Sequence, residues 1–112
     1  MADWIFDAAR IEQISVVEMN ERLVKNDDLQ FVDVRRAGEY ESGHAPRAVN
    51  LTLSDFESST DNLDASRPTY VICQGGYRSS AATSILERKG FREIYNITGG
   101  TGAWLENGLQ VE

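Results

Sequence analysis

Cysteine and histidine are almost absent from this 112-residue chain, which contains one residue of each. A single cysteine forms no disulfide within the chain and rules out a Cys-x-x-Cys redox motif. We therefore expect a reducing, cytoplasmic setting, in which another molecule resolves any covalent intermediate on this cysteine. The chain also lacks any apolar run of about 20 residues, the length that a membrane-spanning helix requires.

Positive charge is the second feature in short supply. The chain has 11 lysines and arginines against 18 aspartates and glutamates, which gives a formal net charge of −7. Nucleic-acid-binding proteins need a basic footprint, and an acidic membrane surface would repel this chain. The composition therefore argues against nucleic acids and membranes as partners.

The N-terminus lacks the basic region that precedes the apolar part of a signal peptide. The length suits one domain with a single core, so we treat residues 1–112 as one domain. Residues 1–11 form an N-terminal extension. Its apolar residues Trp4, Ile5 and Phe6 favour packing against the domain over a remaining linker.

Hydrophobic periodicity predicts strands that alternate with helices. Residues 15–18 form a capping-box pattern. Apolar residues follow at helical spacing, the last of them Val24, so a helix is predicted over residues 16–25. A second helix is predicted for residues 81–90, with Ala81 on its inner face. Strands are predicted near residues 30–34, 48–51, 69–73 and 93–97, with a fifth short strand near 12–15. This order predicts an α/β fold with a four- to five-stranded parallel sheet flanked by helices on both faces.

The stretch Tyr70–Ser80 combines a strand, the single cysteine and the approach to a helix. Its β-forming residues end at Cys73, and two glycines and Arg78 follow. The N–H groups of such a loop can form a concavity that binds anions, and the positive end of the next helix adds to it. A cysteine held there should have a lowered pKa and react as a thiolate.

The spacing of Cys73 and Arg78 helps to separate the chemistries that use such a thiolate. Enzymes of the protein-tyrosine-phosphatase kind place one residue more between cysteine and arginine, so that the loop wraps a tetrahedral phosphate. Here Ser79 occupies the position of that arginine. The smaller loop suits a sulfur atom carried on the cysteine, a persulfide, better than a phosphoryl group. A Cys–His hydrolase would have to use His44, the only histidine.

Structural interpretations stay open for several of these residues. Cys73 can be an inert core thiol, and Arg78 can be a brace for the loop. Asp33 and Arg35 follow a predicted strand at the end where ligands gather, but such residues ordinarily pair with neighbours and brace loops. His44 precedes a proline turn, which favours a role in fixing that loop by hydrogen bonding.

A glycine-rich segment near the C-terminus, Gly99–Gly102, could suggest dinucleotide binding. The third glycine of a G-x-G-x-x-G pattern would fall at Leu105. We therefore interpret the segment as a tight turn packed near the active site, with Trp104 in the core.

Several segments, taken together and in order, carry a resemblance to a known family. They are Asp33-Val34-Arg35, Glu39-Tyr40, Gly43–Asn50, Cys73–Ser79 and Gly90–Gly100, with Trp104. From Ile14 to Val111 the chain resembles the single-domain rhodanese (thiosulfate sulfurtransferase) family. The resemblance implies a rhodanese-like fold, a five-stranded parallel sheet flanked by helices, and sulfur transfer through a persulfide on Cys73. The chain departs from the family at Ala45, usually β-branched, and at Arg47, usually glycine.

The resemblance and the loop lead to one main hypothesis, an enzyme of the thiosulfate sulfurtransferase type. The Cys73 thiolate attacks the outer sulfur of a donor such as thiosulfate, and Arg78 helps to attract that anion. A thiophilic acceptor, which is cyanide, a small thiol or a protein thiol, then takes the sulfur. The mechanism requires no metal and no organic cofactor. The residues expected to hold the persulfide are Gln74, Gly75, Gly76, Tyr77, Arg78 and Ser79, with Asp33, Arg35 and His44 in supporting positions.

Two other hypotheses compete with this one. The first is a carrier or regulatory module that passes persulfide sulfur to a specific protein partner and has little activity on thiosulfate. The second is a small-loop phosphatase or arsenate reductase, which the length of the loop disfavours.

Overall fold

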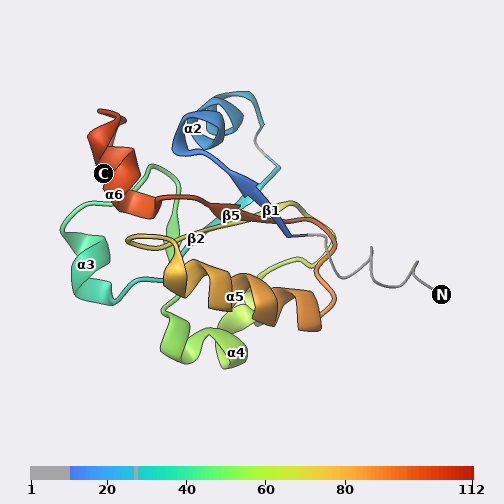
Figure 1. Ribbon diagram of the computed structural model, residues 1–112. Coiled ribbons are helices and arrows are strands. Elements are labelled where there is room, and N and C mark those ends of the chain that lie inside the picture. The colour runs from blue at the N-terminus through green and yellow to red at the C-terminus, as the bar shows by residue number, and fades with distance from the viewer. Residues whose placement is uncertain (1–10, 27) are drawn as a thin grey trace.

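Five short parallel strands form one sheet in the order β1-β5-β4-β2-β3, with helices on both faces (Figure 1). The computed structural model describes residues 11–26 and 28–112. Residues 1–10 of the expected N-terminal extension, with Trp4, Ile5 and Phe6, lie outside the described residues. The strands are β1 (Ile11–Ile14), β2 (Gln30–Asp33), β3 (Val49–Asn50), β4 (Thr69–Ile72) and β5 (Ile94–Ile97). The predicted fold class is confirmed, and the fifth strand is present as β1.

The helices alternate with the strands along the chain, as the sequence pattern predicts, and α6 follows the last strand. They are α2 (Val16–Lys25), α3 (Ala37–Glu41), α4 (Phe56–Ser59), α5 (Tyr77–Arg88) and α6 (Gly100–Glu106), with 3-10 turns at Leu53–Asp55 and Thr60–Asn62. None of the helices in the described part of the chain is long and apolar enough to cross a membrane.

Helix α2 begins at its predicted capping residue. The Ser15 side chain accepts a hydrogen bond from the Glu18 N–H at 3.1 Å, which satisfies one of the free N–H groups at the helix start. Met19 and Leu23 are buried on the inner face, but Val24 is 81% exposed. The prediction for Val24 is wrong because each residue turns about 100° further around a helix, which carries Val24 away from the buried stripe.

Helix α5 begins four residues earlier than predicted, at Tyr77. Its buried face consists of Ser79, Ala82, Thr83 and Leu86, whereas Ala81 is exposed. The expected inner position of Ala81 is therefore wrong. The hydroxyl groups explain how two polar residues can be buried there: Thr83, for example, donates to the Ser80 carbonyl at 2.8 Å.

The core has two layers, one on each face of the sheet. Phe31, Ile72 and Trp104 belong to the layer under α2 and α6. Val71 and Cys73 belong to the other layer, under α4 and α5. The alternation of strand side chains accounts for this division, because residues two apart face the same side.

Strand β4 is the centre of the sheet, between β2 and β5. Its carboxyl end therefore lies beside the segments that follow both neighbours, which is where open parallel sheets bind ligands. Figure 1 shows α3 and the starts of α5 and α6 at this same end of the sheet. The fold thus brings Cys73, the Asp33–Arg35 segment and the glycine-rich segment together.

Candidate active site

Cys73 lies where β4 ends and is followed by a three-residue loop that leads into α5. Gly76 caps α5 with a φ of 106°, a left-handed conformation that glycine adopts at little cost. This turn directs the Gly76 N–H back toward the sulfur, at a distance of 3.0 Å from Sγ. The Ser79 hydroxyl oxygen, in the first turn of α5, lies 3.3 Å from Sγ on another side.

These donors favour the thiolate form of Cys73. Burial raises the pKa of the thiol, but hydrogen bonds from the Ser79 hydroxyl and from the backbone N–H groups of Ser79, Gly76 and Gly75 outweigh it. The pKa of Cys73 therefore lies below that of an ordinary thiol. The start of a 12-residue helix at Tyr77 adds the positive end of a dipole to the same place.

Cys73 is only 1% exposed. This burial is what the interpretation as an inert core thiol expects. The hydrogen-bond donors around Sγ favour a reactive thiolate over an inert core thiol, because an apolar environment alone would raise the pKa of the thiol. The arrangement is that of a shielded sulfur that favours negative charge.

The loop rests on the start of α6. The N–H groups of Thr101 and Gly102 donate to the carbonyl oxygens of Cys73 and Gln74, at 2.7 and 3.0 Å. Gly100 permits this contact, because a Cβ atom at its position would lie 2.3 Å from the Cys73 carbonyl oxygen. The segment expected to be a tight turn therefore begins a helix and supports the backbone that carries the thiol.

Asp33 and Arg35 pair with each other and are almost fully buried. Arg35 Nη2 donates to Asp33 Oδ2 at 2.9 Å and to the Gly43 carbonyl at 2.8 Å. Arg35 Nη1 lies 3.4 Å from the Gln74 side-chain oxygen. The pair thus links the ends of β2 and β4 to the segment after α3 without touching the sulfur.

His44 lies apart from the thiol in the turn after α3. Its ring stacks on Tyr40, with centroids 3.7 Å apart, and its Nδ1 is 2.8 Å from the Tyr40 carbonyl oxygen. Its backbone exchanges hydrogen bonds with Glu112. None of these contacts involves Cys73, so the structure does not join His44 to the cysteine as a catalytic pair.

The departure from the family at Arg47 has a visible conformation. Arg47 is the one non-glycine residue with positive φ in the described ranges 11–26 and 28–112, at 70°. Residues with a Cβ atom are strained in this left-handed region of the backbone. Its guanidinium donates to the Leu23 carbonyl at 2.8 Å, at the end of α2. The arginine therefore keeps a backbone shape suited to glycine and also caps a neighbouring helix.

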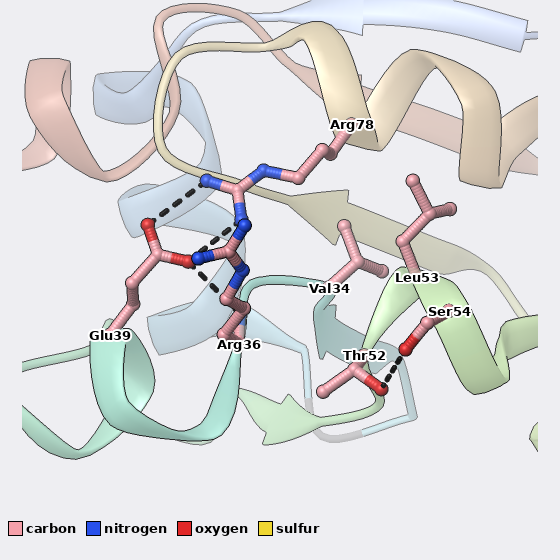
Figure 2. A pocket seen from close by; sticks show the side chains of 7 residues that line it. All are labelled: Val34, Arg36, Glu39, Thr52, Leu53, Ser54 and Arg78. Carbon is pink, nitrogen blue, oxygen red and sulfur yellow. Dashed lines mark hydrogen bonds and ion pairs between the residues drawn. The ribbon is translucent and has the colours of Figure 1, made fainter.

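Arg78 and Tyr77 lie on the outer side of the loop. Tyr77 is 89% exposed. Arg78 forms a two-pronged ion pair with Glu39 of α3, with N–O distances of 2.7 and 3.0 Å (Figure 2). The Arg78 hydrogen bond, and a further one from the Arg36 N–H, lower the pKa of Glu39 to about 2, so its carboxylate is ionised at neutral pH.

Glu39 was not assigned a role from the sequence, although it lies in a segment that carries the family resemblance. The signal that could have found it is topological. Segments that follow neighbouring parallel strands meet at one edge of the sheet, so an acid after β2 can reach a cation after β4. The sequence alone does not give the distance between Glu39 and Arg78.

Two cavities lie at this end of the sheet. One, of about 400 Å³, is lined by Val34, Arg36, Glu39, Thr52, Leu53, Ser54 and Arg78 (Figure 2). The other, of about 300 Å³, includes Arg35, Gln74 and Thr101 in its lining. Glu39 lines both cavities. In the described part of the chain, no group of three histidine, cysteine, aspartate or glutamate residues is placed to hold a metal ion.

The family model named "Rhodanese-like domain" matches residues 15–107. The chain belongs to the rhodanese-like family. The solved rhodanese-like domain protein from Staphylococcus aureus agrees, with a TM-score of 0.80 and 28% identity, over 90% of this chain and 98% of that one. A rhodanese-related protein from Thermoplasma volcanium has a TM-score of 0.81 and 27% identity, over 90% and 97% of the two chains. The predicted rhodanese-like fold is therefore confirmed.

Relatives in this rhodanese-like family include sulfurtransferases. "Thiosulfate sulfurtransferase GlpE" from Coxiella burnetii is 33% identical over 93 residues, which are 83% of this chain and 86% of GlpE. "Putative sulfur carrier protein YrkF" from Bacillus subtilis is 30% identical over 88% of this chain but only 53% of YrkF. The chain therefore spans about half the length of YrkF, and it spans 60% of another B. subtilis relative, YqhL.

Proposed function

We propose that this protein is a sulfurtransferase that carries sulfane sulfur as a persulfide on Cys73. The observation that carries the proposal is the environment of Sγ, which receives the Gly76 N–H at 3.0 Å beside the Ser79 hydroxyl in a rhodanese-like domain. Main-chain donors in this position stabilise a thiolate and, after transfer, the terminal sulfur of a persulfide.

The reaction consists of two balanced displacements. The Cys73 thiolate attacks the outer sulfur of thiosulfate, the S–S bond of the donor breaks, and sulfite leaves with the electron pair. The product is Cys73–S–S⁻. An acceptor such as cyanide then attacks the outer sulfur, which forms thiocyanate and regenerates the thiolate. This is covalent nucleophilic catalysis with ping-pong kinetics.

A second candidate is a carrier that passes sulfur mainly to a protein thiol, in a cytoplasmic setting. Two observations favour it. The relative YrkF bears the name of a sulfur carrier, and the cation expected to attract thiosulfate, Arg78, is already paired with Glu39. Both candidates share the Cys73 persulfide and differ in the acceptor.

The test is the intact mass of the protein after exposure to thiosulfate, with cyanide release of thiocyanate as the second readout. We expect a gain of one sulfur atom that cyanide removes, and no gain in Cys73→Ser. Ser79→Ala provides a graded control. Loss of the hydroxyl raises the pKa of Cys73, so its sulfur uptake should be slow at neutral pH and recover at higher pH.

The outcomes separate the alternatives. Sulfur gain with rapid thiocyanate formation supports the enzyme, whereas gain with slow thiocyanate formation and rapid transfer to a protein thiol supports the carrier. Absence of sulfur gain from thiosulfate and from small persulfides, combined with hydrolysis of a phosphate ester, would support the phosphatase hypothesis instead.

A further inference from the structure

Each of two arginines near the Cys73 loop is paired with a carboxylate. Arg35 pairs with buried Asp33, and Arg78 pairs with Glu39. Arg78 is the cation expected from the sequence to attract an anionic donor. Figure 2 shows the Glu39 carboxylate, from α3, directed at the Arg78 guanidinium, from α5. The partner of Arg78 therefore bears on how strongly the site attracts anions.

The cavity of about 400 Å³ beside the loop shows how the charges are balanced. Its lining contains the two arginines Arg36 and Arg78 and the single carboxylate Glu39. The charged groups therefore leave one net positive charge rather than two. This cavity borders the end of the sheet that carries the thiol, because Val34 lines it and the Val34 N–H bonds the Ile72 carbonyl at 3.0 Å.

A net charge of one distinguishes between classes of sulfur donor. Thiosulfate is a dianion, whereas the persulfide of a small neutral thiol carries one charge at most. A second negative charge on the donor is attracted by the two arginines and repelled by the Glu39 carboxylate. At a separation of about 4 Å, the interaction between two unit charges changes the binding constant roughly fivefold even in water.

We propose that Glu39 is a specificity-determining residue, which holds Arg78 and lowers the preference of the site for dianionic thiosulfate relative to singly charged alkyl persulfides. The inference rests on the proposed function, because it concerns the donor that loads Cys73. With an alkyl persulfide as donor, the thiolate attacks the outer sulfur of R–S–S⁻ and the S–S bond breaks. The leaving R–S⁻ takes a proton from the solvent, so the products are Cys73–S–S⁻ and R–SH.

A purely structural role for Glu39 makes a different prediction. Glu39 also accepts a hydrogen bond from the Arg36 N–H at 3.0 Å, so it helps to shape the start of α3. If this shaping were its whole contribution, its loss would alter the use of all donors by the same factor. Only an electrostatic role changes the ratio between doubly and singly charged donors.

The experiment compares kcat/KM for thiosulfate and for the persulfide of 2-mercaptoethanol, with cyanide as acceptor, in the full chain. The variant is Glu39→Gln, which removes the charge, keeps the size of the side chain and retains one of its two acceptor oxygens. We expect the thiosulfate-to-persulfide ratio to rise about fivefold or more. High salt should reduce this gain, because screening weakens interactions between exposed charges.

Two controls make the result specific. Glu41→Gln removes an exposed charge from the same helix and should leave the ratio unchanged. Glu39→Asp keeps the charge, and its ratio should stay close to that of the wild type even if the shorter side chain lowers both rates.

An unchanged ratio in Glu39→Gln, or equal losses with both donors, would overturn the inference while leaving the persulfide mechanism in place. The same holds if Glu39→Asp and Glu39→Gln alter the ratio alike. Wild-type protein that gains no sulfur from either donor overturns the proposed function together with the inference.

Discussion

The inner side of the Cys73 loop rests on buried groups, whereas its outer side carries exposed ones. The inner side contacts the start of α6 and the Asp33–Arg35 pair, whose side chains are 0% and 4% exposed. The outer side presents Tyr77 and the Arg78–Glu39 pair, whose side chains are 33% and 36% exposed. Each side contains an arginine paired with a carboxylate, so the two pairs have the same chemistry and differ in their burial.

Burial decides what each pair contributes. A buried charge that loses its partner remains unpaired in a medium that solvates it poorly, at a cost of about 3–5 kcal/mol. An exposed pair is screened by water and salt, and its contribution is roughly 0.2–1 kcal/mol. The inner pair therefore fixes the frame of the site, and the outer pair can change its partners at low cost. We therefore expect a sulfur donor to approach from the outer side.

The largest expected effect comes from Asp33→Asn. This change leaves the Arg35 guanidinium buried without a carboxylate, and we expect the free energy of unfolding to fall by about 3–5 kcal/mol. Urea denaturation measures this change in the free energy of unfolding without adding salt. Glu39→Gln, the matched change on the outer side, should lower it by less than about 1 kcal/mol.

Equal losses for the two variants would contradict the comparison. If Asp33→Asn is too unstable to purify, a double variant that also replaces Arg35 by methionine removes both buried charges. It should recover much of the lost stability, because the unpaired charge is the source of the penalty.

The next largest effect is expected for Gly100→Ala, again on the inner side. Gly100 has a φ of 57°, and an added Cβ would lie 2.3 Å from the Cys73 carbonyl oxygen. The left-handed conformation alone costs about 1–2 kcal/mol for a residue with a Cβ, and the overlap must displace the loop as well. We expect a loss of stability above 2 kcal/mol by urea denaturation and slower sulfur uptake by Cys73.

Gly75→Ala provides the matched change on the outer side of the same loop. A Cβ at Gly75 meets no heavy atom within 4 Å, and its φ lies outside the positive range. Its stability should stay within about 0.5 kcal/mol of the wild type. A large loss at Gly75 with a small one at Gly100 would reverse the assignment of the two sides.

The sequence predicted the inner side of this site better than the outer side. Alternating strands and helices implied a parallel sheet, and its geometry brings Asp33 and Arg35 to the edge where Cys73 lies. The buried stripe of α2 followed from its spacing up to Leu23. Helix α5 was predicted to start too late, because the two serines before Ala81 suggested a loop. Both serines lie in the helix, and the hydroxyl oxygen of Ser79 is 3.3 Å from the Cys73 sulfur.

Contacts between distant segments could not be predicted in the same way. The Arg78–Glu39 pair joins residues 39 positions apart, and its existence depends on how α3 is oriented at the end of the sheet. The burial of Cys73 likewise depends on contacts between distant segments, because Phe56 of α4 and Leu86 of α5 belong to the same core layer. Local patterns identify residue types with a chemical purpose, but the partner of a charge is set by packing.

The smallest effect concerns the acid dependence of the outer pair. The pKa of Glu39 is lowered from 4.5 to about 2 in the folded protein, chiefly by its hydrogen bond with Arg78. A carboxyl with a depressed folded-state pKa contributes stability above its unfolded pKa and loses it as the pH falls through the folded pKa. The stability difference between wild type and Glu39→Gln should therefore be constant near neutral pH and shrink between about pH 4.5 and pH 2. Urea denaturation across this range measures it, and its plateau should stay below about 1 kcal/mol because the pair is partly exposed to water. A difference that grows on acidification would mean that the carboxylate opposes folding, and the outer side would then be held together by something other than this ion pair.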